Sequence, residues 1–469
     1  MIKRSQTYNT KETLVIFLHD TPNYKQLAEI DPELSTLLKK YTKAKKWTEK
    51  TSQVVQTTAE PTAPKIVFVN CGKSADVTEQ SFRKLAGNVV RSLSKESSVQ
   101  WAVVDAISDW ENHLAQVIEM ASYLVPNQKS KDTKLPKVNH KILSKNKSFI
   151  DEGIAVGQAV NHARTFANQP ANVLTTTEFV KQIKELLKGD DRYKVTVLNE
   201  TQLTKQKMNA LVGVGQGSKY PSYLVDITYN GSEKDHIAFV GKGVVFDTGG
   251  ISIKPSRNMK EMKGDMGGAA AVVGAAWAAG QLNLKRKISF VVPIVENMVS
   301  ADAQRPGDVV VASNGTSIEI TNTDAEGRLI LADALVYTAK KNVDCMLDIA
   351  TLTGASIIAL GPYAISVMGN NQNVVDQLIN HSNDYSERCW QLPLFDDYKD
   401  LLKSDVADIL NANEGREAGT ITAAKFLETF VGDTPWAHLD IASTMSVSSN
   451  KGDQVKGMTG AGTRSLISF

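Results

Sequence analysis

A chain of 469 residues is too long for one ordinary domain, which predicts two. Its 42% hydrophobic and 22% charged residues are those of a soluble globular protein, and a net charge of +2 argues neither for nor against nucleic-acid binding. Cys71, Cys345 and Cys389 lie far apart, which excludes a CxxC motif and a disulfide ladder and fits a reducing compartment.

Two apolar stretches bear on membrane insertion. The run at residues 14–18 is too short for the hydrophobic region of a secretory signal. Residues 266–284 lack charge over a membrane-like length, but Ala and Gly dominate them, whereas a bilayer span needs Leu, Ile, Val and Phe. We therefore predict a tightly packed core helix here, no membrane partner and a cytoplasmic location.

The first 125 residues alternate short apolar runs with polar helical stretches. Strands are expected at residues 13–18, 65–70 and 100–106. An amphipathic helix is expected at 79–94, because apolar residues recur at helical spacing: Phe82, Leu85, Val89, Val90 and Leu93. This alternation predicts a small α/β domain.

Residues 126–147 carry seven lysines against one aspartate, a local charge of 7 − 1 = +6, and two prolines. This composition predicts a solvated linker that ends a first domain of residues 1–147. A nucleic-acid contact is the alternative, and it is disfavoured because the stretch has no aromatic interleaving and no recognisable binding fold.

Residues 148–469 predict a second, larger α/β domain. A helix is expected from 149 until Pro170 stops it, and a hairpin across Asn314-Gly315 within 309–323. Other helices are expected at 266–282 and 327–341. Buried strands are expected at 194–199, 222–229, 236–241, 287–295 and 345–351.

Two carboxylates stand at a predicted strand-to-helix junction in NTDAEGR, residues 322–328. An expected strand at 316–323 leads into Asp324 and Glu326, and side chains two apart in an extended chain point to the same side. Both carboxylates should therefore reach one point, at a place where α/β sheets bind ligands. Helix capping or solvation is the alternative for the pair taken alone.

Further charged residues lie in FVGKGVVFDTGGISIKP, residues 239–255. Lys242 follows a buried strand between two glycines, Asp247 precedes a Gly-Gly turn, and Lys254 precedes Pro255. An Asx turn for Asp247 and surface positions for the lysines are the alternatives. A long cation at the end of a buried strand instead indicates an amine directed at a partner.

Asp265 stands where the N-cap of the expected helix at 266–282 belongs, and capping is one interpretation of it. Gly267, Gly268 and the following alanines keep that helix slim, so that another backbone can approach it closely.

Four carboxylates thus lie at the ends of buried elements, near glycines and without a nearby histidine: Asp247, Asp265, Asp324 and Glu326. Carboxylates can hold two divalent ions, and a water shared between the ions is acidic enough to attack at neutral pH. Carboxylate and amine ligands suit Mn²⁺, Mg²⁺ or Zn²⁺, and spacing does not choose among them.

The basic residues have distinct chemical options. A lysine binds metal only as the neutral amine, and lowering its pKa to about 7 costs roughly 4–5 kcal/mol, which metal coordination can supply. Without such contact, Lys254 would stay cationic and could polarise a carbonyl. Arg328 cannot lose its proton, but it can hold a small oxyanion that takes the proton of the water.

These segments resemble the leucine (cytosol) aminopeptidase family of di-zinc exopeptidases. NTDAEGRL is the family's signature octapeptide. Four further stretches appear in the family's order and spacing: GKGVVFDTGGISIKP, MKGDMGGAAAV, LDIATLTGA and PWAHLDIA. The resemblance covers about 160–469, and the first 150 residues match only as the family's variable N-terminal α/β domain.

The resemblance implies a fold and a site. The catalytic domain would have a mixed central sheet flanked by helices. Asp247 and Glu326 would bridge both metals, Asp324 would complete the more exchangeable site, and Lys242 and Asp265 would complete the tighter one. Lys254 and Arg328 match the family's catalytic lysine and arginine, the latter cradling a bicarbonate that acts as general base.

The resemblance also implies a substrate. The free N-terminal amine of a peptide would lie on the tight metal beside Asp265, and Leu352 would lie at the backbone that meets bicarbonate and substrate. Five residues match positions that line the family's pocket for the first side chain: Met262, Thr351, Gly354, Ala442 and Met445. One departure is Ser443, where the family usually has Gly, and it bears on the leucine preference.

We therefore predict a metal-dependent leucyl aminopeptidase that releases Leu and other apolar residues from peptides with a free N-terminus. Zn²⁺ or Mn²⁺ is expected, with Mg²⁺ or Co²⁺ as further candidates at the exchangeable site. The resemblance implies a homohexamer. The alternatives are a two-metal phosphoesterase, an additional nucleic-acid-binding role, and a non-enzymatic protein with a fossil site.

Overall fold

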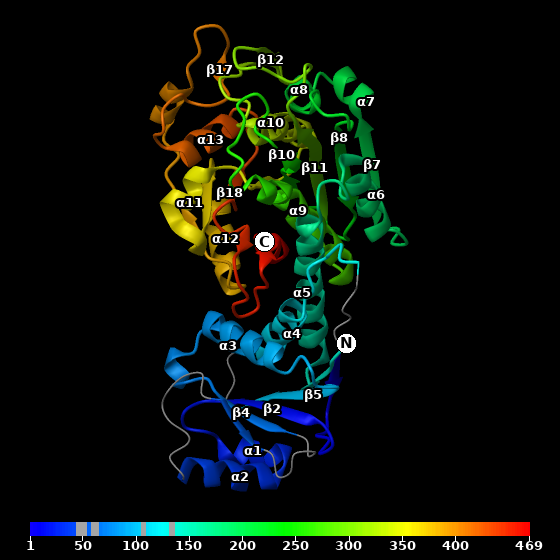
Figure 1. The fold of residues 1–469 in the computed structure, drawn as a ribbon, viewed down its shortest axis with the longest axis vertical. Helices are drawn as coiled ribbons and strands as arrows, with labels where there is room; N and C mark the ends of the chain where they lie inside the picture. Colours follow the sequence, from blue (N-terminus) through cyan, green and yellow to red (C-terminus); the bar gives the residue numbers. More distant parts are fainter. Residues whose placement is uncertain (44–53, 58–64, 105–108, 131–136) are drawn as a thin grey trace. The chain divides into compact units, whose positions relative to one another are not determined.

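The structure is a computed structural model that describes residues 1–43, 54–57, 65–104, 109–130 and 137–469. The chain forms two compact units (Figure 1). Unit 1 contains residues 1–158 and 449–455, and unit 2 contains residues 159–448 and 456–469. The domain boundary expected from the sequence, between 147 and 148, falls at the first turn of helix α5, Lys147–Asn168, and stays a prediction.

Unit 1 is built on a six-stranded sheet in the order β1-β6-β5-β2-β4-β3. All neighbours in it are parallel except β3, which is antiparallel to β4. Its strands are β1 Ile2–Ser5, β2 Thr13–Leu18, β3 Val54–Thr57, β4 Ile66–Asn70, β5 Ser98–Val103 and β6 Asn139–Leu143. Its helices are α1 Tyr24–Ile30, α2 Pro32–Lys43, α3 Glu79–Ser92 and α4 Trp110–Ala121.

Helices cover both faces of this sheet, because β2 is buried at every position and its side chains alternate between the faces. Val15 and Phe17 pack with α3 and α4, whereas Leu14 and Ile16 pack with α1 and α2. The five apolar residues predicted for the helix at 79–94 are all buried, so the amphipathic prediction is confirmed.

The prediction of a solvated linker at 126–147 is wrong in part. Residues 139–143 form β6, which lies between β1 and β5, and its His140 and Ile142 are buried. Residues 131–136 of that stretch lie outside the described residues, as do residues 105 and 106 of the strand expected at 100–106. Strands β1 and β3 were not predicted.

Unit 2 contains a nine-stranded mixed sheet. Its main order is β16-β15-β18-β14-β9-β11-β8-β7, and β10 pairs with β11. The strands are β7 Tyr193–Asn199, β8 Tyr223–Tyr229, β9 His236–Gly241, β10 Gly243–Asp247, β11 Lys287–Asn297, β14 Cys345–Ala350, β15 Ile365–Gly369, β16 Cys389–Gln391 and β18 Trp436–Asp440. The expected mixed central sheet is therefore present, and the five strands predicted within it are found as β7, β8, β9, β11 and β14.

The helices of unit 2 flank this sheet (Figure 1). Side chains of β9 alternate between two cores: Phe239 packs with α9 Gly267–Gln281, whereas Ala238 and Val240 pack with α10 Glu326–Ala339. The remaining helices include α6 Thr176–Leu186, α7 Glu200–Lys205, α8 Asn209–Gly215, α11 Gly354–Leu360, α12 Gln372–Asp384, α13 Gly419–Glu428 and α14 Thr463–Ser468.

Helix α9 is the core helix predicted from its Ala and Gly content. A Cβ on Gly268 would overlap the carbonyl oxygen of Ile349 in β14, so helix and strand meet backbone to backbone, as expected. Within the described ranges, every helix is too short or too polar to span a bilayer.

Two small sheets complete unit 2. The predicted hairpin is formed by β12 Val309–Val311 and antiparallel β13 Ser317–Glu319, and Gly315 in its turn has a φ of +95°. β13 also pairs with β17 Ile409–Leu410. β19 Ser446–Val447 pairs with β20 Gly457–Met458 near the C-terminus.

Candidate metal centre

The charged residues singled out in the sequence gather where the parallel strands of the unit 2 sheet end. Lys242 follows β9, Asp247 ends β10, and Thr351 follows β14. Because β9 is parallel to both β11 and β14, and β10 to β11, their carboxyl ends meet at one edge. Ligands bind at this edge in α/β proteins.

Three carboxylates form a tight, buried cluster. One oxygen from each of Asp247, Asp265 and Glu326 lies within 4.8 Å of one from each of the others. The Nζ atom of Lys242 lies 2.9 Å from Asp265 Oδ2 and 2.8 Å from Glu326 Oε1, and it donates to the carbonyl oxygen of Thr351 at 3.0 Å. All four side chains are at most 8% exposed.

Several oxygens of this cluster are incompletely satisfied. Among the described residues, Asp265 Oδ2, Asp324 Oδ1 and Glu326 Oε1 are buried and accept no hydrogen bond. Each lies 2.5–2.9 Å from a lysine nitrogen and is paired with it by charge. Buried carboxylate oxygens without a hydrogen bond are typical of groups that bind a cation, rather than of groups that only stabilise the fold.

Asp324 joins the cluster at its more exposed side. Lys254 Nζ lies 2.8 Å from Asp247 Oδ2 and 2.5 Å from Asp324 Oδ1, so the lysine links the two carboxylates. The Asp324 side chain is 32% exposed, against 2% for Glu326. The sequence analysis placed Asp324 and Glu326 on the same side of one extended strand, and this prediction is wrong. Strand β13 ends at Glu319, Asp324 lies in a turn, and Glu326 begins α10.

Burial and neighbouring charges shift the pKa values of the carboxylates in the cluster. Burial and the charge of Glu326 raise the pKa of Asp247 to about 7, and burial also raises the pKa of Asp265 well above its ordinary value. Burial opposes the charge of Glu326 as well, but the ammonium groups of Lys242 and Lys254 outweigh it and lower its pKa. Additional positive charge would stabilise all three ionised carboxylates.

Two of the local interpretations considered for the aspartates are settled by the backbone. Asp247 does form an Asx turn, because its Oδ1 accepts from Gly249 N at 2.8 Å. Asp265 is not the N-cap of α9, a position held by Met266. Its Oδ1 instead accepts the hydroxyl of Thr351 at 2.9 Å.

Arg328 lies in the first turn of α10 and is buried. Its Nη1 donates to the carbonyl oxygen of Asn411 at 2.8 Å, whereas its Nε has no partner among the described residues. Burial lowers its pKa to about 10, which leaves the guanidinium charged at neutral pH. It therefore has donors available for an anion.

The residues matched to the substrate pocket lie around the cluster. Asp440 Oδ1, at the end of β18, accepts from the backbone nitrogens of Leu352 at 3.2 Å and Ala442 at 3.1 Å. The carbonyl oxygen of Met262 accepts from Asp265 N at 3.2 Å. Gly354 begins α11 and faces open space.

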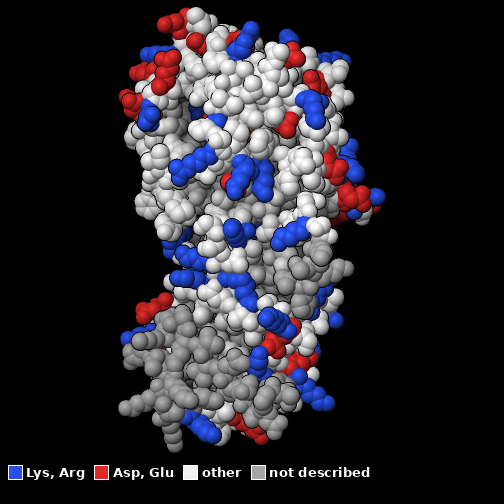
Figure 2. All heavy atoms as spheres, viewed as in Figure 1, with Lys and Arg blue, Asp and Glu red and all other residues white. Residues whose placement is uncertain are grey.

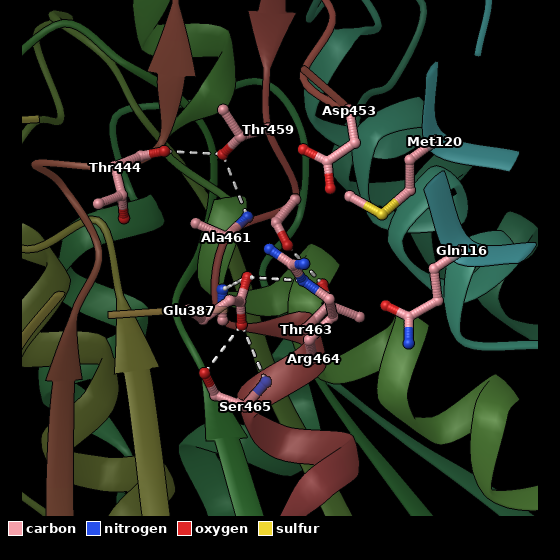
Figure 3. Close-up of polar contacts among 12 residues, drawn as sticks. Gln116, Met120, Glu387, Thr444, Asp453, Thr459, Ala461, Thr463, Arg464 and Ser465 are labelled. Atoms are coloured by element: carbon pink, nitrogen blue, oxygen red, sulfur yellow. Dashed lines mark hydrogen bonds and ion pairs between the residues drawn. The ribbon is translucent and has the colours of Figure 1, made fainter. Parts of the chain in front are cut away.

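The C-terminal segment holds the chain at Thr444, the residue before Met445 (Figure 3). Thr459 N donates to Met445 O at 3.0 Å, and Thr459 Oγ1 donates to Thr444 O at 2.7 Å. Glu387 in turn holds the start of α14, because its carboxylate accepts from Gly462 N at 3.1 Å and from Ser465 N at 2.9 Å. Met445 is thus fixed by contacts within unit 2.

Ser443, the departure from the family pattern, does not direct its hydroxyl at the cluster. Its Oγ donates to the carbonyl oxygen of Ala364 at 2.7 Å, and the residue is buried. The polar group is satisfied by the scaffold rather than left free near the residues matched to the pocket.

Three buried polar residues beside the cluster were missed in the sequence: Asn297, Asn411 and Asp440. Each stands at or just past the end of a strand. A polar residue after an apolar run was the available signal. It is weak, because asparagine and aspartate also stop strands in ordinary turns.

Family models match both parts of the chain. The catalytic domain of the cytosol aminopeptidase family matches residues 161–467, and the N-terminal domain of the same family matches residues 15–132. The chain belongs to the cytosol aminopeptidase family. The family recognised in the sequence is confirmed, and so is its two-domain α/β fold class.

Individual members of the family resemble the chain along most of its length. A probable cytosol aminopeptidase of Geobacter sp. (strain M21) is 37% identical over 97% of this chain and 96% of that protein. One of Phytoplasma australiense is 43% identical over 80% and 78%, respectively. The solved structure of the bottromycin maturation enzyme BotP in complex with Mn is 30% identical, with a TM-score of 0.87 over 98% of both chains.

The family and these relatives support aminopeptidase activity and make the chain a peptidase among hydrolases. They favour this over the phosphoesterase alternative. On the face of unit 2 in view, lysines and arginines are interspersed with aspartates and glutamates, rather than forming one basic surface (Figure 2).

Proposed function

We propose that the protein is a metal-dependent leucyl aminopeptidase that uses two divalent cations to remove Leu and other apolar residues from peptides. The observation that carries the proposal is the buried cluster of Asp247, Asp265 and Glu326, with carboxylate oxygens that accept no hydrogen bond. Oxygen ligands with one amine suit Zn²⁺ or Mn²⁺, with Mg²⁺ or Co²⁺ as further candidates at the exchangeable site. The manganese complex of BotP favours a divalent ion of this kind.

The positions of the ligands support a division into a tight and an exchangeable site. Lys242 and Asp265 would complete the tight site, because both are almost fully buried. Asp324 would complete the exchangeable site, because its side chain is 32% exposed. Asp247 and Glu326 would contribute to both sites.

When bound, the two cations would acidify a water molecule and polarise the scissile carbonyl. Burial opposes the charge of Lys254, but the carboxylates around it, Asp247 foremost, raise its pKa above the ordinary value. Lys254 would therefore stabilise negative charge on the carbonyl oxygen. Arg328 would hold a bicarbonate with its remaining donors, which places a base for the proton of the water.

The surroundings of Asp265 suit a free N-terminal amine. An amine beside this carboxylate would have a buried partner of opposite charge, whereas an acylated amine would have none. Met262, Thr351, Gly354, Ala442 and Met445 would contact the first side chain, and Leu352 the peptide backbone. This arrangement would account for exopeptidase specificity.

The decisive assay compares free and blocked substrates. After chelation and addition of Mn²⁺ or Zn²⁺, the protein should cleave leucine p-nitroanilide but not its N-acetylated form or p-nitrophenyl phosphate. The chelated protein without added metal is the control. Equal turnover of the free and blocked amines would refute exopeptidase action, and turnover of the phosphate ester would favour the phosphoesterase.

The proposal includes a cytoplasmic homohexamer acting on peptides. Large apolar side chains are exposed on unit 2, among them Ile358 at 89%, Val406 at 68% and Tyr363 at 67%. Exposed apolar residues of this size are typical of surfaces that a partner covers. Light scattering of the purified protein should give the mass of six subunits, and a monomer mass would refute the assembly.

A further inference from the structure

Asn297 is an uncharged residue that lies beside the carboxylate cluster. It is the last residue of β11 and is 5% exposed. Its Nδ2 donates to Asp247 Oδ1 at 2.8 Å and to the carbonyl oxygen of Thr323 at 3.1 Å. One amide group therefore contacts both a carboxylate of the cluster and the residue that precedes Asp324.

The contact with Asp247 distinguishes its two oxygens. Oδ1 accepts from Asn297 Nδ2 and from Gly249 N, both at 2.8 Å. Oδ2 faces Lys254 Nζ at 2.8 Å and is left on the side of the cations. Two donors on one oxygen fix the rotation of the carboxylate before any cation binds.

The contact with Thr323 connects two segments that are distant in the chain. Thr323 Oγ1 donates to Gly249 O at 2.6 Å and accepts from Ser252 N at 2.8 Å. The carbonyl oxygen of Asn297 accepts from the backbone nitrogen of Thr248 at 3.0 Å. Asn297 therefore ties the end of β10 to the turn that carries Asp324.

An amide is chemically suited to this position. It supplies two N–H donors without charge, so it can satisfy two oxygens and still not repel a cation. An arginine or lysine would place positive charge against the metals, and an ionised aspartate would have no hydrogen to donate. The residue type thus matches a supporting role for a metal ligand.

We propose that Asn297 is a positioning residue that orients Asp247 and the Asp324 turn for metal binding. The inference rests on the proposed function and deepens it, because it assigns metal affinity to a residue outside the ligand set. Loss of such an outer partner typically weakens metal binding by about 10–100-fold.

The test is calorimetric titration of metal-stripped full-length protein with Mn²⁺. Asn297→Ala removes both donors and should bind about 10–100-fold more weakly than wild type. Asn297→Ser keeps a single hydroxyl donor and should lose less, and it carries the test if the alanine variant does not fold. Thermal unfolding without metal shows how much of each variant is folded.

Asn370→Ala is the control for the loss of two side-chain hydrogen bonds away from the cluster. Asn370 also makes two hydrogen bonds to backbone, to Thr434 O at 3.0 Å and from Trp436 N at 2.8 Å, but at the opposite end of β18 from Asp440. It should lose stability and keep the wild-type affinity for Mn²⁺.

The outcomes separate the inference from the function on which it rests. If the Asn297 variants bind Mn²⁺ within twofold of wild type, or if Asn370→Ala is weakened equally, the positioning role is refuted while the function stands. If wild type itself binds no Mn²⁺, Zn²⁺ or Co²⁺, the proposed metal function fails, and the inference fails with it.

Discussion

Both units place the carboxyl ends of parallel strands at one edge of a sheet, yet the two edges differ in chemistry. In unit 1 the edge is lined mainly by apolar residues, including Phe17, Val77 and Phe82, with His19 and Cys71 beside them. In unit 2 the corresponding edge holds Lys242, Asp247 and their charged neighbours. Shared architecture therefore does not assign function, which depends on the residues placed at strand ends.

The electrostatic consequence of this difference is large. Burial raises the pKa of the Cys71 thiol to about 12, so this group stays neutral and needs no counter-charge. At the second edge, Asp247, Asp265 and Glu326 are buried together. Buried carboxylates at this spacing must be protonated or paired with cations. Only the second edge, of the two, therefore favours metal binding.

The largest effect is expected for Asp324→Ala. Removal of a proposed metal ligand should lower turnover of leucine p-nitroanilide by more than about 100-fold, the upper end for loss of an outer partner. The fold should survive, because the turn is held by Asn411, which donates to Asn322 O at 2.7 Å and accepts from Thr321 N at 2.9 Å. Metal content and activity of the folded variant measure both effects.

Matching circular dichroism of wild type and Asp324→Ala is the control for folding. If the variant kept full activity, Asp324 would not be a metal ligand, and the charged edge of unit 2 would have one proposed ligand fewer.

Much of the fold followed from the sequence, and the exceptions have physical reasons. Five of the nine strands in the unit 2 sheet were predicted, because they contain long apolar runs, whereas β10, β15, β16 and β18 were not. Strand β6 was missed because it lies in a lysine-rich stretch, with Lys141 inside the strand and Lys137 and Lys145 on either side of it. His140 and Ile142, two residues apart, are both buried, but this alternation is visible only in the structure.

The candidate site was predictable to the extent that its residues are chemically distinctive. Asp247, Asp265 and Glu326 were chosen from distant segments, and the structure brings them together. The geometric basis for pairing Asp324 with Glu326 failed, because a strand expected to continue through residue 323 ends at Glu319. Asn297 could not be found, because an asparagine after a strand is ordinary turn chemistry until its partners are known.

A smaller effect is expected for Ser443→Gly, which restores the residue usual in the family. Its hydroxyl is bonded to Ala364 O rather than directed at the cluster. The lost hydrogen bond and the added backbone freedom should together cost about 1–2 kcal/mol of unfolding free energy. The ratio of kcat/KM for leucine and alanine p-nitroanilides should not change. A shifted ratio would place Ser443 among the specificity determinants.

The smallest effect is expected for Cys71→Ala at the edge of unit 1. Removing a buried sulfur should cost about 1 kcal/mol of stability, and turnover per folded molecule should equal that of wild type. Cys389→Ala is the matched control, because it makes the same change at a buried position of unit 2 away from the cluster. If Cys71→Ala lowered turnover while Cys389→Ala did not, the apolar edge would share in catalysis. The difference in residues between the two edges would then no longer show which edge takes part in catalysis.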